Sequence, residues 1–412
     1  MTDDLMKSSG SGDAGNSTHA DEQRLYPKVR FRGFDEPWKK VKLGEISEKI
    51  TQKNNNSCSQ FPVLTNSAEY GIVYQKDFFD KNIAINTDNY YVVHTEDFVY
   101  NPRISKQAPY GPIRVNHLKT GVMSPLYYIF KIKDDFNIGF FEFLFIGNKW
   151  HKFMYQNGDS GARSDRYAIK DKVFNKLPIY IPQKIEEQKL IFEINHKINS
   201  LLYLQQRKLE LISALEKGLG QIIKQQNNKY GITFSLNNFL EIPPQIQARI
   251  KNKNQLLTVK LNLQGLARGV QRDTLSLGST KYFIRHTGEL IFGKQNIFNG
   301  SIALITKEFD GLATSNDVPS LKISNINPQF LFYLLKNPDF WKHTELIATG
   351  TGSKRVHIHD LLKLHIKIIP DAKYQAKIVS LSRNFEKIVL NQQIIVKECE
   401  KTKQFLLQNL FI

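Results

Sequence analysis

Two long stretches of the chain repeat apolar residues at alternating spacings of three and four. The first covers residues 185–228 and the second residues 371–412. This spacing places the apolar side chains along one seam of a helix that packs against another helix. We therefore predict two long helices that form a coiled coil. Its predicted seam residues are Ile191, Ile194, Ile198, Leu201, Gln205, Ile212, Leu215 and Leu219 in the first helix, and Ile378, Leu381, Phe385, Ile388, Gln392, Ile395, Cys399 and Leu406 in the second.

The two helical stretches are copies of each other at a fixed offset of 187 residues, so that Ile191 corresponds to Ile378 and Gln205 to Gln392. A short predicted strand that ends in proline precedes each helix, as "KLPIYIP" and as "KLHIKIIP". Both helices carry glutamine at the same seam position. A buried polar group at such a position can specify register at some cost in stability.

The repeat extends upstream of the helices. "EFLFIGNKWHKF" resembles "QFLFYLLKNPDFWK", and in a preceding pair of segments Gly111 corresponds to Gly300 and Gly121 to Gly311. The loops "NGDSGARSDRYAIKD" (157–171) and "TGTGSKRVHIHD" (349–360) also match in character. We therefore predict an α+β protein made by duplication of about 190 residues. It has two globular α/β domains in tandem, each followed by a long helix, and the helices form an antiparallel coiled coil with pseudo-two-fold symmetry.

The predicted boundaries follow from this repeat. Residues 1–25, rich in Gly, Ser and Asp, are expected to be a disordered leader. Residues 26–184 form the first globular domain and 185–228 the first helix. Residues 229–370 form the second domain and 371–412 the second helix. Helices of about 35–40 residues rise about 50–60 Å, which exceeds one DNA turn of about 34 Å.

The composition favours a polyanionic partner. The chain holds 57 Lys and Arg against 39 Asp and Glu, a net charge of +18. Such an excess suits nucleic acid or an acidic membrane surface, although many basic proteins bind neither. The two cysteines allow no disulfide framework or zinc spacing, which fits a reducing cytoplasm. No apolar run approaches the roughly 18 residues of a membrane span, and the start of the chain lacks the apolar core of a signal peptide.

The glycine-rich loop at 349–355 suggests phosphate binding, but it is not a Walker A element. That motif needs Gly-Lys-Ser/Thr at the start of a helix, whereas here Gly352, Ser353, Lys354 and Arg355 follow in another order, and a short strand or turn is expected next. Two interpretations stay open. The loop is a basic turn that contacts DNA, or it is a surface turn with solvated charges.

The sequence offers no complete set of catalytic or metal-binding residues. "NPRI" at Asn101 and "NPDF" at Asn337 lack the second proline of an amino-methyltransferase motif. Asp371 in "PDAK" is better explained as a helix cap than as part of a nuclease site, because the other copy has "PQKI". His357 and His359 lie on one face of a predicted strand, but their ligand set is incomplete. We predict no catalytic residue and no metal site.

Clusters of Arg, Lys, Asn and Gln in loops of both domains are the predicted DNA contacts. Arg, Asn and Gln can pair bidentately with base edges, and Lys and Arg contact phosphates. The predicted residues are Asn101, Arg103, Lys106, Gln107, Arg114, Arg163, Ser164, Arg166, Arg268, Gln271, Arg272, Lys294, Gln295, Asn296, Lys354 and Arg355.

Two segments carry a family resemblance. "YPKVRFRGFDEPWKKVKLGEI" near the start and "GARSDRYAIKDKVFNKLPIYIPQKIEEQKLI" before the first helix resemble the specificity (S) subunit of type I restriction–modification enzymes. The second copy keeps the pattern more loosely, with "YQAKI" where the first has "EEQKLI". The resemblance covers nearly all of the chain after Tyr26.

The resemblance implies a non-catalytic chain of a bacterial or archaeal cytoplasm. Each globular domain would be a target-recognition domain that reads one half of a bipartite, asymmetric site in double-stranded DNA. The helices would set the gap and dock two modification (methyltransferase) subunits, and two restriction subunits would complete the endonuclease. S-adenosylmethionine, ATP and Mg²⁺ would bind to those partners and no cofactor to this chain.

Three alternatives remain at this stage. The first is an enzyme, a fused methyltransferase or nuclease. The second is a coiled-coil adaptor with an incidental basic surface. The third is a silent or partnerless copy of a specificity subunit that binds DNA without sequence preference.

Overall fold

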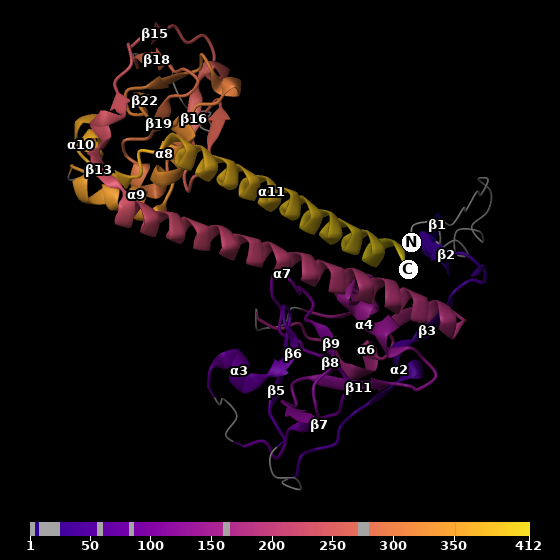
Figure 1. The fold of residues 1–412 in the computed structure, drawn as a ribbon. Coiled ribbons are helices and arrows are strands. Elements are labelled where there is room, and N and C mark those ends of the chain that lie inside the picture. The colour runs from indigo at the N-terminus through magenta and orange to yellow at the C-terminus, as the bar shows by residue number, and fades with distance from the viewer. Residues whose placement is uncertain are drawn as a thin grey trace. The chain divides into compact units, whose positions relative to one another are not determined.

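The computed structural model describes residues 5–7, 25–55, 61–81, 86–159, 165–270, 280–350 and 352–412. The chain divides into two compact units. Unit 1 consists of Met1–Gln206 and Ile395–Ile412, and unit 2 of Arg207–Ile394. Two long helices, α7 (Ile185–Tyr230) and α11 (Ala372–Asn409), each contribute a segment to both units (Figure 1). The predicted mixture of helix and strand and the two long helices are confirmed.

Unit 1 is built around a four-stranded antiparallel sheet in the order β4-β11-β8-β9, with two-stranded pairs β12–β3, β10–β7 and β5–β6 beside it. Its strands are β1 (Leu5–Lys7), β2 (Val29–Phe31), β3 (Lys39–Lys42), β4 (Ser47–Lys49), β5 (Leu64–Ser67), β6 (Gly71–Tyr74), β7 (Tyr91–Val93), β8 (Phe98–Tyr100), β9 (Ile113–Val115), β10 (Gly121–Met123), β11 (Tyr128–Ile132) and β12 (Pro178–Ile181). Its shorter helices are α2 (Leu43–Ile46), α3 (Gln75–Phe79), α4 (Ile138–Ile146), α5 (His151–Asn157) and α6 (Asp171–Phe174).

The leader departs from the prediction of disorder at three residues. Leu5–Lys7 form β1, which pairs antiparallel with β2. Residues 1–4 and 8–24 lie outside the described residues.

The segment "IGFFEFLFI", apolar except for Glu142, forms helix α4. The helix lies between the sheet and α7 (Figure 1), and five of its nine residues are buried. A Cβ atom added at Gly139 would lie 2.1 Å from the ring of Phe192 on α7, so only glycine permits this close approach of the two helices. The N-terminus of α4 is capped by Asn137, whose side chain accepts from the Phe140 N–H.

Unit 2 builds a four-stranded antiparallel sheet with the order β14-β22-β19-β20. Its strands are β13 (Ile232–Ser235), β14 (Leu240–Glu241), β15 (Gln247–Ala248), β16 (Leu257–Val259), β17 (Leu266–Arg268), β18 (Tyr282–Ile284), β19 (Leu290–Phe292), β20 (Ile302–Leu304), β21 (Ala313–Ser315), β22 (Ser320–Ile323) and β23 (His365–Ile368). Its shorter helices are α8 (Pro328–Leu335), α9 (Pro338–His343) and α10 (Ile358–Leu362), with 3₁₀ turns η2 (Leu236–Asn238), η3 (Lys253–Gln255), η4 (Ile297–Asn299), η5 (Lys307–Phe309) and η6 (Thr344–Ile347).

The same glutamine contact anchors a long helix in each unit. In unit 1, Gln188 accepts from the Asn137 N–H at 3.0 Å and donates to the Pro182 carbonyl. In unit 2, Gln375 accepts from the Asn327 N–H at 3.4 Å and donates to the Ile369 carbonyl. Asn137 and Asn327 cap α4 and α8. Each glutamine therefore joins the first turn of a long helix to the preceding strand and to a capped helix of the body.

Segments of both long helices complete the two hydrophobic cores. The core of unit 1 includes Ile191 of α7 and Leu406 of α11 together with the sheet. The core of unit 2 includes Ile223 of α7 and Ile378 of α11. The helices are therefore part of both cores, because their removal would expose apolar surface in each unit.

Both long helices bury one heptad row, with spacings of three and four. In α7 the buried or half-buried row is Gln188, Ile191, Asn195, Ile198, Leu202 and Gln205 in unit 1, then Leu209, Ile212, Glu216, Leu219 and Ile223 in unit 2. In α11 it is Gln375, Ile378, Ser382, Phe385, Val389 and Gln392 in unit 2, then Val396, Cys399, Lys403, Leu406 and Leu410 in unit 1.

Some of the predicted seam residues lie outside this buried row, which corrects the predicted seam at those positions. Of the predicted residues, Leu201, Leu215, Ile388 and Ile395 are 42–64 % exposed, and Ile194 and Leu381 are half-buried beside the row. The sequence pattern favoured these positions because they hold apolar residues. The buried row instead carries polar residues at some positions, such as Asn195, whose amide donates to the Ile191 carbonyl.

A buried ion pair joins the start of α7 to the first part of unit 1. Arg30 donates from Nε and Nη2 to the two carboxylate oxygens of Glu187 at 2.8 and 2.9 Å, and the Trp38 indole N–H donates to the same carboxylate at 3.2 Å. Removing one partner of a buried pair leaves an unpaired charge and costs about 3–5 kcal/mol.

We predict that Glu187→Gln lowers the free energy of unfolding by about 3–5 kcal/mol, measured by denaturant titration of the full chain. Glu186→Gln is the matched control, because Glu186 is exposed on the same turn, and it should change the free energy by less than about 0.5 kcal/mol. Equal effects of the two substitutions would contradict this role of the pair.

Candidate nucleic-acid interface

Each unit brings two of the predicted DNA-contacting loops together. In unit 1, residues 101–108 and the described residues 158–159 and 165–168 form what we call loop pair 1, joined by the Tyr167 N–H to the Pro102 carbonyl (2.8 Å) and the Ile104 N–H to the Asp165 carbonyl (3.0 Å). In unit 2, residues 293–296 and the described residues 349–350 and 352–356, which we call loop 349–356, form loop pair 2, joined by the Val356 N–H to the Lys294 carbonyl (2.8 Å). Arg166 directly precedes Tyr167 and Arg355 directly precedes Val356, the residues whose N–H groups join the two loops of each pair.

Two of the predicted contacts in unit 1 are already engaged within the protein. Asn101 is buried, and its amide donates to the Asn66 carbonyl while accepting from the Arg103 N–H. Arg114 donates to the carbonyls of Ile113 and Ala68, and burial lowers its pKa. These side chains hold β8 and β9 to a neighbouring segment, so their hydrogen-bonding groups are occupied in this structure.

The other described residues predicted in unit 1 offer more accessible charge. Arg103, Lys106 and Gln107 are exposed. Arg166 is half-buried; its Nε lies 3.9 Å from the Asp165 carboxylate and makes no hydrogen bond. Arg163 and Ser164 lie outside the described residues.

A cavity of about 740 Å³ adjoins loop pair 1. Tyr100, Tyr128, Arg166 and Asp171 are among the residues that line it. Burial, together with the nearby Asp171 carboxylate, raises the pKa of Tyr128 to about 12. This phenol is therefore protonated at neutral pH and contributes a polar, uncharged surface to the cavity.

The charges of Arg355 and Lys354 in loop pair 2 are compensated by carboxylates of neighbouring segments of unit 2. Arg355 lies 3.4 Å from Asp317 through Nη1, and its Nη2 and Nε donate to the Gln295 amide oxygen at 2.8 and 3.1 Å when that amide is oriented to accept. Lys354 pairs with Glu345 at 2.8 Å. The positive charge of loop 349–356 is therefore largely neutralised within the unit.

The remaining predictions in unit 2 are spread over several elements. Lys294 is half-buried, and Asn296 accepts from the side chain of Asn299. Arg268 on β17 is exposed and donates to the Glu308 carbonyl. Gln271 and Arg272 lie outside the described residues.

The segment that follows loop 349–355 is a helix, which corrects the expectation of a strand or turn. His357 precedes α10 as its N-cap, and His359 lies within the helix with Nδ1 3.5 Å from Asp360. The helix forms because Leu361 of this segment enters the core of unit 2. In the described part of the chain no three His, Cys, Asp or Glu side chains are grouped to hold a metal ion.

Two acid-free basic stretches extend beyond the loops from which DNA contacts were predicted. From Phe98 to Lys133 the sequence has no Asp or Glu but six Lys or Arg. From Ile242 to Arg272 it likewise has no Asp or Glu and six Lys or Arg. The first stretch runs along β8–β11 and the second along β15–β17. The absence of acidic residues over about 30 positions was the sequence signal that could have identified them.

The helices of the described residues include none that is both long and apolar enough to cross a membrane.

Comparison with known proteins places the fold. No family model matches the chain, and none of the curated proteins matches it. Among solved structures, the S subunit of a type I restriction–modification system from M. genitalium is 10 % identical, with a TM-score of 0.56. The superposed region covers 94 % of this chain and 99 % of that chain. The HsdS subunit from Thermoanaerobacter tengcongensis is 14 % identical, with coverages of 91 % and 96 % and a TM-score of 0.48. A chain of another type I R-M system structure is 12 % identical, with coverages of 91 % and 97 % and a TM-score of 0.49. The chain therefore has the fold of the S subunit of type I restriction–modification systems.

Proposed function

We propose that the chain is the DNA-specificity subunit of a type I restriction–modification complex and has no catalysis of its own. The observation that carries this proposal is the likeness to an S subunit over 94 % of the chain. The net charge of +18 and the two acid-free basic stretches support a role on DNA. The partners of the proposed complex are double-stranded DNA, two modification subunits and two restriction subunits.

In this proposal the two globular domains, residues 26–184 and 229–370, each read one half of a bipartite DNA site. The matching sheet orders, β4-β11-β8-β9 and β14-β22-β19-β20, support descent of the two domains from one duplicated unit. The two loop pairs support corresponding roles in recognition. Phosphate contacts by Lys and Arg would give affinity that falls with salt, and side chains at the base edges would give specificity.

The helices, residues 185–228 and 371–412, would set the gap between the half-sites as an antiparallel coiled coil. In unit 1 the first turns of α7, at Ile191, share a core with the last turns of α11, at Leu406 and Leu410. In unit 2 the last turns of α7, at Ile223, share a core with the first turns of α11, at Ile378. Contacts of start with end in each unit support opposite directions.

The modification subunits would dock on a second apolar row of the helices. In unit 2, Leu211, Leu215 and Ile222 of α7 are 52–64 % exposed and follow the spacing of a heptad seam. They lie one residue before the half-buried Ile212 and Glu216 and the buried Ile223, and therefore on the adjacent face of the helix. Exposed apolar residues in such a row form the surface into which another helix packs its own side chains.

The proposed function is tested by mapping adenine methylation across the genome of cells that carry the matching modification subunit. With this chain present we expect a two-part motif with a fixed gap, and deletion of the gene should abolish methylation at that motif. Methylation that does not change on deletion would contradict the proposal. Co-purification of the modification subunit in that case would indicate a silent copy, and its absence an adaptor of other proteins.

The docking surface predicts that Leu211→Ser, Leu215→Ser and Ile222→Ser together weaken co-purification of the modification subunit by about tenfold or more, since each removes apolar area from the interface. A triple control, Ala214→Ser, Lys217→Ser and Gln221→Ser, changes exposed residues of the same helix and should retain binding. Circular dichroism melting establishes that both variants fold. Retained binding by the apolar variant would contradict docking on this row.

A further inference from the structure

The two cations of loop 349–356 are engaged by other side chains of unit 2. Arg355 is engaged by Asp317 and Gln295, and Lys354 by Glu345. An arginine or lysine paired in this way has to give up its carboxylate before it can neutralise a phosphate, so these two residues contribute little net attraction.

A different cluster of cations lies at the end of unit 2 that holds β15 and β18. The register of this antiparallel pair places Ala248 opposite Tyr282. Arg249 directly follows β15 and Lys281 directly precedes β18, at the same end of this pair, and both side chains are exposed. Two exposed cations at one end of a strand pair both attract an anion that binds there.

Lys251 adds a third exposed cation to this cluster, and its backbone is held in place. The Gln255 side chain accepts from the N–H groups of Lys251 and Asn252 at 2.7 and 3.2 Å. Within the described residues from Ile242 to Val270 the sequence contains no Asp or Glu. The cluster therefore stands on an ordered turn, in a stretch without carboxylates of its own.

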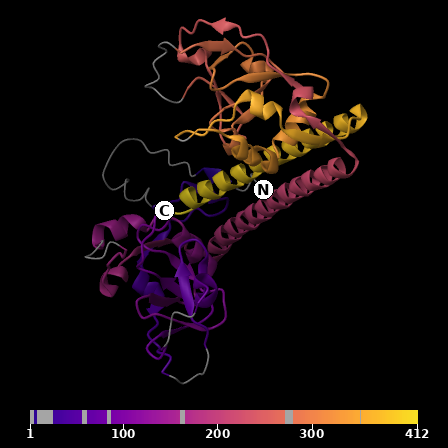
Figure 2. The ribbon, with the colours of Figure 1, turned by 90° about the vertical axis from the view of Figure 1, so that its left-hand side faces the viewer.

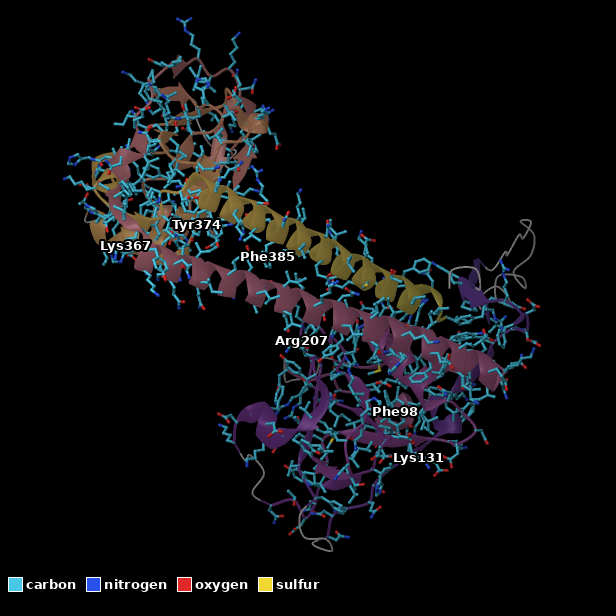
Figure 3. The ribbon with its side chains drawn as sticks, in the orientation of Figure 1. Phe98, Lys131, Arg207, Lys367, Tyr374 and Phe385 are labelled. Carbon is cyan, nitrogen blue, oxygen red and sulfur yellow. The ribbon has the colours of Figure 1, made fainter. Side chains whose placement is uncertain are left out.

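The position of the cluster suits a large ligand. Figures 1 and 2 place β15 and β18 at the end of unit 2 farthest from its α11 segment. Side chains extend outward from this end into open space (Figure 3). A group of exposed cations at such an end suits the repeated phosphates of a duplex better than a small anion, which needs a closed site.

We propose that unit 2 holds the sugar–phosphate backbone of DNA with Arg249, Lys251 and Lys281 at the β15–β18 end, and that loop 349–356 contributes no comparable electrostatic anchor. This inference rests on the proposed function, because it assigns the backbone contacts of the second half-site. Loop composition alone would instead assign the phosphate contacts to Lys354 and Arg355.

The test compares three variants of the full chain in complex with the modification subunits. They are Arg249→Ala/Lys251→Ala/Lys281→Ala at the β15–β18 end, Lys354→Ala/Arg355→Ala in loop pair 2, and a control, Lys322→Ala/Lys342→Ala/Lys363→Ala. Lys322 and Lys363 of the control are ion-paired with carboxylates of the same unit, and Lys342 lies over the Trp341 ring. Affinity for non-specific duplex DNA, and for DNA with the methylated motif, is measured at several salt concentrations.

Each phosphate contact contributes about 0.9 to the slope of log K against log salt. We expect the β15–β18 variant to lose about 2–3 from this slope and to bind both DNAs about tenfold or more weakly, with the preferred motif unchanged. The loop variant and the control should keep the slope on non-specific DNA. Unchanged melting temperature and co-purification establish that each variant folds.

An unchanged slope in the β15–β18 variant, or an equal loss in the loop variant, overturns this inference while leaving the proposed function in place. If the complex with the unaltered chain shows no preference for any DNA sequence, the proposed function fails and the inference fails with it.

Discussion

The structure depends on the anchoring of the two long helices in the globular cores. A helix of 46 residues such as α7 cannot be held by its own hydrogen bonds against fraying and tilting. Here Gln188 and Gln375 bind the capped starts of α4 and α8, and the Arg30–Glu187 pair adds a charged contact at the first of these anchors. Because both cores include turns from both helices, the sheets and helices are expected to fold cooperatively.

The two long helices, and the short strand before each, could be predicted from the sequence because the apolar periodicity of the helices is strong and recurs at one offset. Ten of the sixteen predicted seam residues lie in the buried row, but its polar members could not be predicted. Asn195, Glu216 and Ser382 occupy this row, while Leu201, Leu215 and Ile388 lie on the exposed side. Counting apolar residues therefore misassigns these positions. The exposed Leu211, Leu215 and Ile222 leave an apolar row of α7 uncovered, and this row is the basis of the proposed docking surface.

Candidate DNA contacts were harder to predict than the fold. Asn101 and Arg114 have suitable side chains, but their hydrogen-bonding groups are taken by the carbonyls of Asn66 and Ala68, about 35–46 residues earlier in the chain. Composition of a loop cannot reveal such long-range contacts. It also cannot reveal that Asp317 and Glu345 come close to Arg355 and Lys354. Acid-free stretches are a second guide, because such a region holds no carboxylates of its own to pair with its cations.

In the proposed function the helices set the distance between two DNA-reading domains. This spacing is tested by removing one heptad, seven residues or about 10 Å, from corresponding positions in the middle of α7 and α11. The methylated motif is then mapped. We expect both half-sites to stay the same and the gap between them to become shorter by about three base pairs, at about 3.4 Å each. Altered half-sites with an unaltered gap would contradict it.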